Sequence, residues 1–177
     1  IVTPASPMEV RKATLAAYEH KGPLYLRLGT NKEPEIYEED YSFELGKGVT
    51  LREGSDITLI TSGSILKDVL EIAEELKKDG ISARVINIHT IKPIDKDIIE
   101  KAIEETGKIV TIEDHNIIGG LGSAVAEVIA EYGKGVMFKR FGLTHFSKGY
   151  GSYQELKANN GIGKEYIYNQ LKDLAKV

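Results

Sequence analysis

The segment from Lys108 to Tyr132 (KIVTIEDHNIIGGLGSAVAEVIAEY) limits the possible folds more than any other part of the chain. It begins with a short apolar run, passes through an acidic pair, a histidine and a glycine cluster, and ends in apolar residues spaced three and four apart. Such a run is typical of a buried strand, and such spacing is typical of an amphipathic helix. The segment therefore predicts a strand, a glycine turn and a helix in succession, which is the repeating unit of an α/β sheet.

Residues 46–177 continue this alternation and predict one α/β domain. Helices of about 10–15 residues alternate with short apolar strands, which implies a mainly parallel sheet covered on both faces. The predicted strands are 48–51 (a candidate edge strand), 57–61, 82–88, 109–112 and 136–141, and the predicted helices are 65–78, 96–105, 121–132, 153–158 and 164–174.

The start of the chain carries a separate helix signal. Ser6 is placed as an N-cap and Pro7 at the first helical position. Glu9 stands where its side chain can bond back to the N-cap amide in a capping box. The helix is expected to stop at Gly22-Pro23.

Two short apolar runs, 1–3 and 24–28, predict strands on either side of this helix. One helix and two strands bury too little surface to form a core, so we expect residues 1–28 to be the end of an upstream domain. The first residue is Ile and not Met, which leads us to expect that the chain begins inside a larger protein. The acidic, aperiodic stretch 29–45 predicts an interdomain linker, with a solvated acidic loop as the alternative.

Composition excludes several classes of function. The formal net charge of −4 gives no support to a nucleic-acid partner, which would need a basic surface. The chain has no cysteine, so disulfides and thiolate metal sites are excluded. No apolar run approaches the roughly 20 residues that span a bilayer, and no basic-then-apolar leader is present. We expect a cytoplasmic protein without membrane contact.

The glycine cluster Gly119, Gly120 and Gly122, with Ser123, lies where a helix begins. Free amides and the helix dipole at such a place can hold an anion. The spacing is not that of a dinucleotide fingerprint. The alternative is that the glycines only let the turn and helix pack tightly on the sheet.

His115 and Arg27 are the other candidate site residues. His115 follows two carboxylates at a strand end, where α/β sheets place their sites, and it is either a proton carrier or a turn residue satisfied by backbone. Arg27 either grips a phosphate or carboxylate in bidentate fashion or forms an internal ion pair. No spaced set of metal ligands is present, so no metal site is expected.

Three motifs carry a family resemblance. The segments TIKPID (90–95), TGKIVTIEDHNIIGGLGSAVAEV (106–128) and GYGSYQEL (149–156) resemble the C-terminal domain of the transketolase family. The stretches VTPASPMEVRKAT and GPLYLRLGT resemble the end of the preceding pyrimidine-binding domain. The resemblance is greatest to the separate C-terminal subunits of small transketolases, followed by 1-deoxy-D-xylulose-5-phosphate synthase and, more distantly, the β subunits of 2-oxoacid dehydrogenases.

The resemblance implies a domain division and a fold. Residues 1–28 are the tail of the pyrimidine-binding domain, 29–45 the linker and 46–177 the C-terminal domain. The expected fold is a three-layer α/β/α domain whose mixed, mostly parallel sheet has about five strands, with the first, Gly48–Leu51, running antiparallel at the edge.

The resemblance also implies thiamine diphosphate chemistry in the whole enzyme, in which a two-carbon ketol unit passes between sugars. The activating glutamate and the domain that holds the diphosphate and Mg²⁺ have no counterpart in these residues. No catalytic residue is therefore assigned, and this chain alone is expected to be inactive and to bind neither cofactor nor metal.

One position departs from the family pattern. Members that act on sugar phosphates have a phosphate-gripping arginine three residues after the position of Arg27, and Thr30 stands there in this chain. A neutral hydroxyl does not replace a guanidinium fork, although Lys32 is a nearby cation.

We therefore expect this chain to be an assembly module. It would pack onto the N-terminal and pyrimidine-binding parts of a transketolase and help to form a homodimer. The alternative is a small-anion or partner-docking module that uses the turn from Gly119 to Ser123 and His115.

Overall fold

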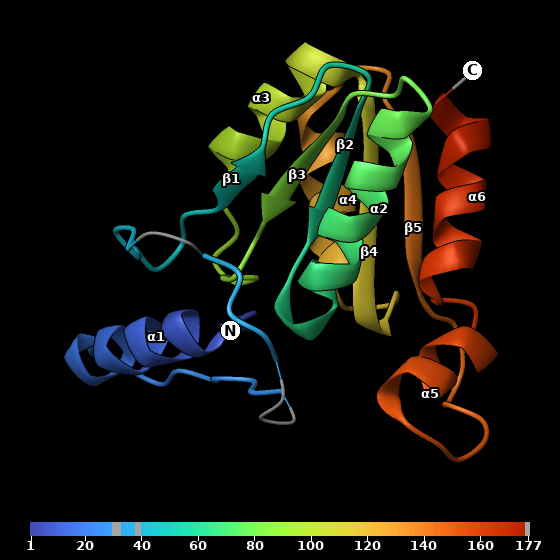
Figure 1. Cartoon of the computed structure of the whole chain (residues 1–177). Coiled ribbons are helices and arrows are strands. Elements are labelled where there is room, and N and C mark those ends of the chain that lie inside the picture. Colours follow the sequence, from blue (N-terminus) through green and yellow to red (C-terminus); the bar gives the residue numbers. More distant parts are fainter. Residues whose placement is uncertain (30–32, 38–39, 176–177) are drawn as a thin grey trace.

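The computed structural model describes residues 1–29, 33–37 and 40–175, and it is built around one five-stranded sheet (Figure 1). The strand order is β1-β3-β2-β4-β5. The elements are α1 (Pro7–Glu19), β1 (Val49–Arg52), β2 (Ile57–Thr61), a 3-10 turn (Gly63–Ile65), α2 (Leu66–Lys78), β3 (Ala83–Asn87), α3 (Lys96–Thr106), β4 (Lys108–Asn116), α4 (Leu121–Tyr132), β5 (Met137–Leu143), α5 (Tyr153–Asn159) and α6 (Lys164–Ala175).

The sheet has the predicted mixed topology. Strands β3, β2, β4 and β5 run parallel to one another, and β1 pairs with β3 in the antiparallel sense. All five residues of β2 and all five of β3 are buried, as expected for strands covered on both faces. The predicted antiparallel edge strand is confirmed.

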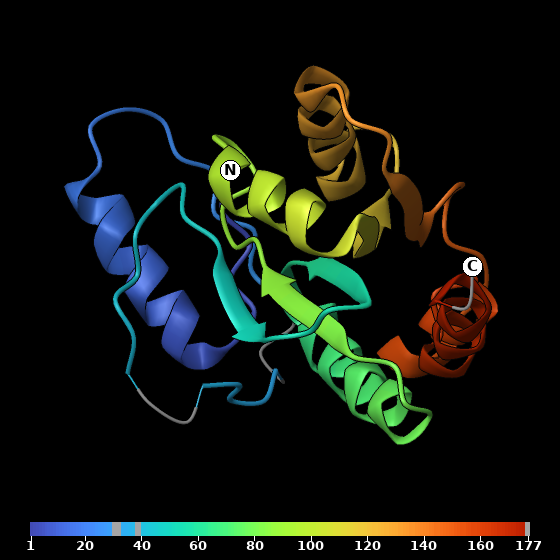
Figure 2. The same cartoon turned by 90° about the horizontal axis from the view of Figure 1, so that it is seen from above.

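Two apolar clusters lie on opposite faces of the sheet. One joins the sheet to α2 and α6, and the other joins it to α3 and α4. Figure 2 shows these two pairs of helices on either side of the sheet. The predicted three-layer α/β/α arrangement is thereby confirmed, with the core divided between the two faces.

Strand β4 is longer than the sequence predicts. The apolar run ends at Ile112, yet the strand continues through Glu113, Asp114 and His115 to Asn116. A register shift after Ile112 lets β4 meet β5 again at Asn116, opposite Leu143. The acidic pair and the histidine therefore lie within the strand, because pairing with β5 continues where the apolar pattern stops.

The two strands predicted in the tail, 1–3 and 24–28, are wrong for the described residues. Val2 makes only isolated bridges, one parallel to Leu26 and one antiparallel to Thr90. A pair this short has no further strand to extend it and does not form a stable sheet. Val2 is nevertheless buried, which places the tail against the end of the main sheet.

Helix α1 begins as predicted, but Glu9 in its first turn does not form the predicted bond to the N-cap amide. The Ser6 hydroxyl accepts the Glu9 amide, so Ser6 is the N-cap. The predicted capping box is wrong, because the Glu9 carboxylate accepts the amide of Ala5 at 2.6 Å and not that of Ser6. Glu9 is fully buried, and its remaining partners come from outside the helix.

Glu9 joins three separate parts of the chain. Its Oε1 accepts the hydroxyls of Tyr37 (2.7 Å) and Tyr41 (2.6 Å) and the side-chain amide of Asn87 (2.9 Å). The rings of Tyr37 and Tyr41 stack at 4.4 Å. We call this cluster of Glu9, Tyr37, Tyr41 and Asn87 the Glu9 junction. It ties α1, the predicted linker and β3 together.

Candidate functional site

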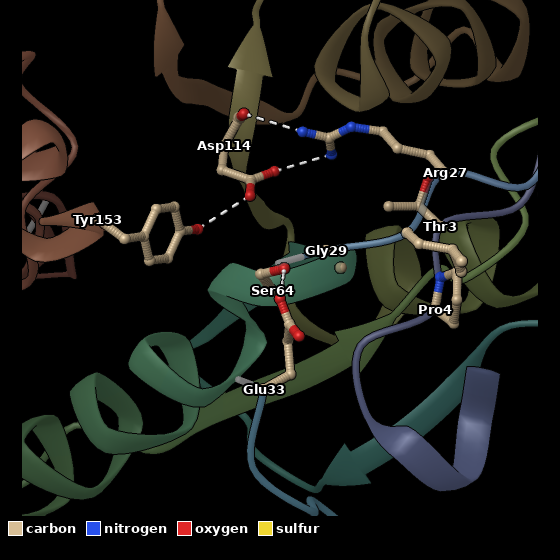
Figure 3. Close-up of a pocket in the computed structure, with 10 residues that line it drawn as sticks. Thr3, Pro4, Arg27, Gly29, Glu33, Ser64, Asp114 and Tyr153 are labelled. Atoms are coloured by element: carbon tan, nitrogen blue, oxygen red, sulfur yellow. Dashed lines mark hydrogen bonds and ion pairs between the residues drawn. The ribbon is translucent and has the colours of Figure 1, made fainter. Parts of the chain in front are cut away.

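A cavity of about 240 Å³ lies where the tail meets the ends of β2 and β4 (Figure 3). We call it the tail cleft. The carboxyl ends of parallel strands are the usual place for sites in α/β sheets. Its lining combines the tail, the segment after it, the 3-10 turn, β4 and α5, namely Thr3, Pro4, Arg27, Leu28, Gly29, Glu33, Gly63, Ser64, Asp114 and Tyr153.

An ion pair crosses this cleft. Arg27 donates from Nη1 to Asp114 Oδ1 at 3.0 Å and from Nη2 to the Asp114 carbonyl at 3.4 Å. The Tyr153 hydroxyl donates to the other carboxylate oxygen of Asp114 at 2.9 Å. Figure 3 shows Arg27 and Tyr153 reaching Asp114 from opposite sides. Of the two roles left open for Arg27, the structure contains the internal ion pair.

Helix α5 is fixed in place by a buried ion pair. Lys157 on α5 pairs with Asp68 in the first turn of α2, and the Lys157 side chain is 2% exposed. Its Nζ lies 4.3 Å from the centre of the Tyr153 ring. The helix also starts with a capping box between Ser152 and Glu155. These contacts orient Tyr153 toward Asp114.

The amides at the glycine turn bind the carboxylate of Glu113, which lies in β4, the strand that leads into the turn. The amides of Leu121 and Gly122, at the start of α4, donate to the two oxygens of Glu113 at 2.8 Å and 2.9 Å. A Cβ at Gly120 would overlap the Glu113 carboxylate, so glycine is needed there for close approach. The helix N-terminus therefore binds an anion, as its dipole favours, but the anion is internal.

Burial and hydrogen bonding act in opposite directions on the pKa of this glutamate. The pKa of Glu113 is raised by burial, and the two amide hydrogen bonds oppose that rise because they stabilise the ionised form.

The remaining polar groups of the turn also bond to one another. Gly119 donates its amide to the Ser123 hydroxyl at 2.9 Å, and that hydroxyl donates to the Ile117 carbonyl at 2.9 Å. Arg140 donates to the same carbonyl at 2.9 Å. These contacts describe a tightly closed turn and support its role in packing.

His115 lies on the edge of a second cavity of about 200 Å³. Its ring Nδ1 is 3.0 Å from the Asn116 carbonyl, and its side chain is exposed. This cavity brings together Arg27, His115, Gly119 and Gly120, while Gly122 and Ser123 are not in its lining. The two cavities share Thr3, Arg27 and Asp114.

Sequence reasoning missed the roles of three residues of the site, namely Glu113, Asp114 and Tyr153. Glu113 and Asp114 stand next to each other in the sequence, directly before His115. Neighbouring residues of a strand point to opposite faces of the sheet, and this rule could have assigned the two carboxylates to different surroundings. In β4, Glu113 turns inward to the start of α4 and Asp114 turns toward the tail. Tyr153 lies in the motif GYGSYQEL, but its bond to Asp114 has no local sequence signal, since that partner is 39 residues away. Thr30 and Lys32 lie outside the described residues.

The site does not fit thiamine diphosphate or its metal ion. Within residues 1–29, 33–37 and 40–175, no three His, Asp or Glu side chains come together in a group that could hold a metal. The amides that could receive a diphosphate at Leu121 and Gly122 are taken by Glu113. In the same described part of the chain, no helix is long and apolar enough to cross a membrane.

Comparison with known proteins identifies the domain. The family described as transketolase, C-terminal domain, matches residues 46–167. The chain belongs to this family. The match starts where the sequence placed the new domain and contains Glu113, Asp114 and Tyr153. Arg27 and Thr3 lie before it.

The relatives also cover the tail. A protein of Methanocaldococcus jannaschii named putative transketolase C-terminal section is 38% identical over 99% of this chain and 55% of its own length. One of the subunits of the apulose-4-phosphate transketolase of Phocaeicola vulgatus is 35% identical over 99% of this chain and 56% of its own. The chain thus spans about half the length of the curated relatives it matches.

A solved structure shares the whole architecture. It is described as a split gene transketolase, inactive beta4 tetramer, and matches 99% of this chain and 57% of its own with a TM-score of 0.91 and 34% identity. The likeness therefore extends beyond residues 46–167 to nearly the whole chain.

Proposed function

We propose that this chain is the C-terminal portion of a thiamine-diphosphate-dependent transketolase, which transfers a two-carbon ketol unit between sugars. The proposal is carried by one observation, the 99% coverage of this chain by proteins named as parts of transketolases. In this proposal the cofactor and Mg²⁺ bind in the rest of the enzyme. The electron-sink chemistry then belongs to the cofactor, and this chain supplies assembly.

The surface of the tail supports an assembly role. Leu15 and Tyr18 on α1, and Tyr25 and Leu28 after it, are exposed by 55%, 90%, 63% and 55%. Four large apolar side chains in so short a stretch form the kind of surface that another chain or domain covers. We infer that the N-terminal and pyrimidine-binding parts of the transketolase cover it, and that the assembled enzyme is a cytoplasmic homodimer.

We also infer that the isolated chain is inactive. The similar solved structure is itself described as inactive in its beta4 form. The test is a ketol-transfer assay on this chain alone and on the enzyme that contains its N-terminal part. We expect activity, dependent on thiamine diphosphate and Mg²⁺, only in the latter.

Calorimetry gives a second test. Thiamine diphosphate titrated into this chain in the presence of Mg²⁺ is expected to give no binding heat. Micromolar binding to the isolated chain would overturn the proposal.

The docking alternative places an external anion or partner at the turn from Gly119 to Ser123. It has to displace Glu113 from the amides of Leu121 and Gly122. Phosphate titrated into the protein and followed by NMR tests it, and amide signals of Gly119 to Ser123 that do not move would end it. Membership in a 1-deoxyxylulose-phosphate synthase or a 2-oxoacid dehydrogenase is tested by assaying the whole enzyme with pyruvate.

A further inference from the structure

The guanidinium of Arg27 is the one cation in the described lining of the tail cleft, and it is already bound. We propose that Asp114, held in place by Tyr153, determines which ligands this cleft accepts, because it occupies Arg27 and so excludes phosphate and other anions. The part of the proposal that concerns substrate choice rests on the proposed function. The part that concerns phosphate binding to this chain is independent of it.

The geometry leaves Arg27 little capacity for a second anion. Both terminal nitrogens of its guanidinium face Asp114, one toward the carboxylate and one toward the carbonyl of the same residue. A firm grip on phosphate uses two parallel N–H donors of the guanidinium fork. Asp114 holds the fork formed by the two terminal nitrogens, so a phosphate that grips Arg27 through that fork has to displace Asp114.

Asp114 is held from its other side. Its second carboxylate oxygen accepts the Tyr153 hydroxyl, and its side chain is 11% exposed, against 36% for that of Arg27. Burial and the charge of Asp114 raise the pKa of the Tyr153 hydroxyl, so it stays protonated and remains a donor at neutral pH. The buried pair of Lys157 and Asp68 fixes the helix that carries Tyr153. Swinging Asp114 away would break contacts on both of its oxygens.

The polar groups that line the cleft include a second carboxylate and hydroxyls. Glu33 lines it together with Asp114. The Ser64 hydroxyl donates to Glu33 at 2.9 Å, and the buried Thr3 hydroxyl has no partner within the described part of the chain. Carboxylates and hydroxyls suit an uncharged, hydroxyl-bearing group such as the polyol part of a sugar.

The direct test titrates inorganic phosphate into the full 177-residue chain and follows the Arg27 side-chain Nε–H and the amides of Gly29 and Ser64 by NMR. Wild-type chain is expected to show no saturable shift. Asp114→Asn keeps the size of the side chain but removes its charge. We expect it to bind phosphate at least about tenfold more tightly than wild type, a difference of about 1.4 kcal/mol.

Three further variants separate this effect from general changes. Asp173→Asn removes an exposed carboxylate on α6 that lies outside the cleft lining, and it is expected to leave phosphate binding unchanged. Tyr153→Phe loosens Asp114 without removing it, so a smaller gain is expected, and it serves as the second variant if Asp114→Asn does not fold. Adding Arg27→Gln to Asp114→Asn is expected to abolish the gain.

Two results would overturn the proposal. One is saturable phosphate binding at Arg27 in the wild-type chain. The other is a folded Asp114→Asn variant that binds phosphate no better than Asp173→Asn.

In the whole enzyme, Asp114→Asn is expected to lower KM for phosphorylated sugars relative to unphosphorylated ones while kcat changes little. An enzyme without ketol-transfer activity would refute the proposed function, yet the phosphate titration of the chain would still decide the role of Asp114.

Discussion

Two buried glutamates, Glu113 and Glu9, differ in how far along the chain their partners lie. Glu113 accepts backbone amides eight and nine residues away. Glu9 accepts hydroxyls and an amide from side chains 28, 32 and 78 residues away. Each carboxylate satisfies several donors at once. The first stabilises one turn inside the C-terminal domain, whereas the second fastens the tail to that domain.

The largest effect is expected from Glu113→Ala. The change leaves two buried amides without acceptors, and hydrogen bonds to a charged group contribute about 1.5–3 kcal/mol each. We expect unfolding of the whole domain to become easier by about 3 kcal/mol, measured by urea denaturation. Glu113→Gln, which keeps one good acceptor, should lose about half as much.

The matched control is Glu127→Ala, an exposed position on α4, the helix whose first amides bond to Glu113, for which little change is expected. If Glu113→Ala and Glu127→Ala had equal stability, Glu113 would not be the group that closes the turn, and the contrast with Glu9 would disappear.

Glu9→Gln is expected to act on the tail more than on the sheet. Gln keeps the shape but weakens the bonds from Tyr37, Tyr41 and Asn87, at a cost of about 2 kcal/mol. Amides of α1 should then exchange hydrogen faster while those of β2 and β3 keep their protection. Glu19→Gln, at the exposed end of α1, is the control. Equal acceleration in α1 and in the sheet would show that the Glu9 junction is part of the main core instead.

The smallest effect is expected from the protonation of His89, which changes the stability of the fold with pH. His89 is buried, its ring stacks on Phe43 at 4.2 Å, and burial lowers its pKa. As the pH falls, His89 therefore takes up a proton in the unfolded chain before it does so in the folded one. The stability that neutral His89 contributes is present above about pH 6.5 and is lost as the pH falls through the lower pKa of the folded state. The raised pKa of Glu113 has the opposite sign, since its contribution is lost as the pH rises.

Melting temperatures of wild type and His89→Gln at pH 5 and pH 7 isolate the histidine, because both proteins contain Glu113. Wild type should lose more stability than the variant on acidification. His20→Gln, at an exposed position, should follow wild type. A wild-type slope no steeper than that of His89→Gln would show that His89 does not cause the effect.

The layers of the fold were predictable because they depend on local periodicity. The alternation of buried strands and amphipathic helices in residues 46–177 predicts the sheet and the helices on its two faces, and the Ser6-Pro7 signal predicts the start of α1. The extension of β4 was not predictable, since Glu113 and Asp114 interrupt the apolar run while pairing with β5 maintains the strand.

The site was only partly predictable, because its contacts join distant residues. Helix-dipole reasoning considered an external anion at the glycine turn, and it did not identify Glu113 as the carboxylate that accepts the amides there. Arg27 could be recognised as a candidate for an ion pair, yet Asp114 is 87 residues away. The Glu9 junction was missed for the same reason, since a capping box is the local explanation for a glutamate at that position.

The irregular edge strand β1 bears on how the protein behaves in concentrated solution. It has only four residues, its register with β3 shifts between Thr50 and Arg52, and Arg52 forms an ion pair with Glu74. A short, bulged edge that carries a charge is a poor template for strand addition by another molecule. Edge-to-edge aggregation through this side of the sheet is therefore disfavoured even when the protein is concentrated.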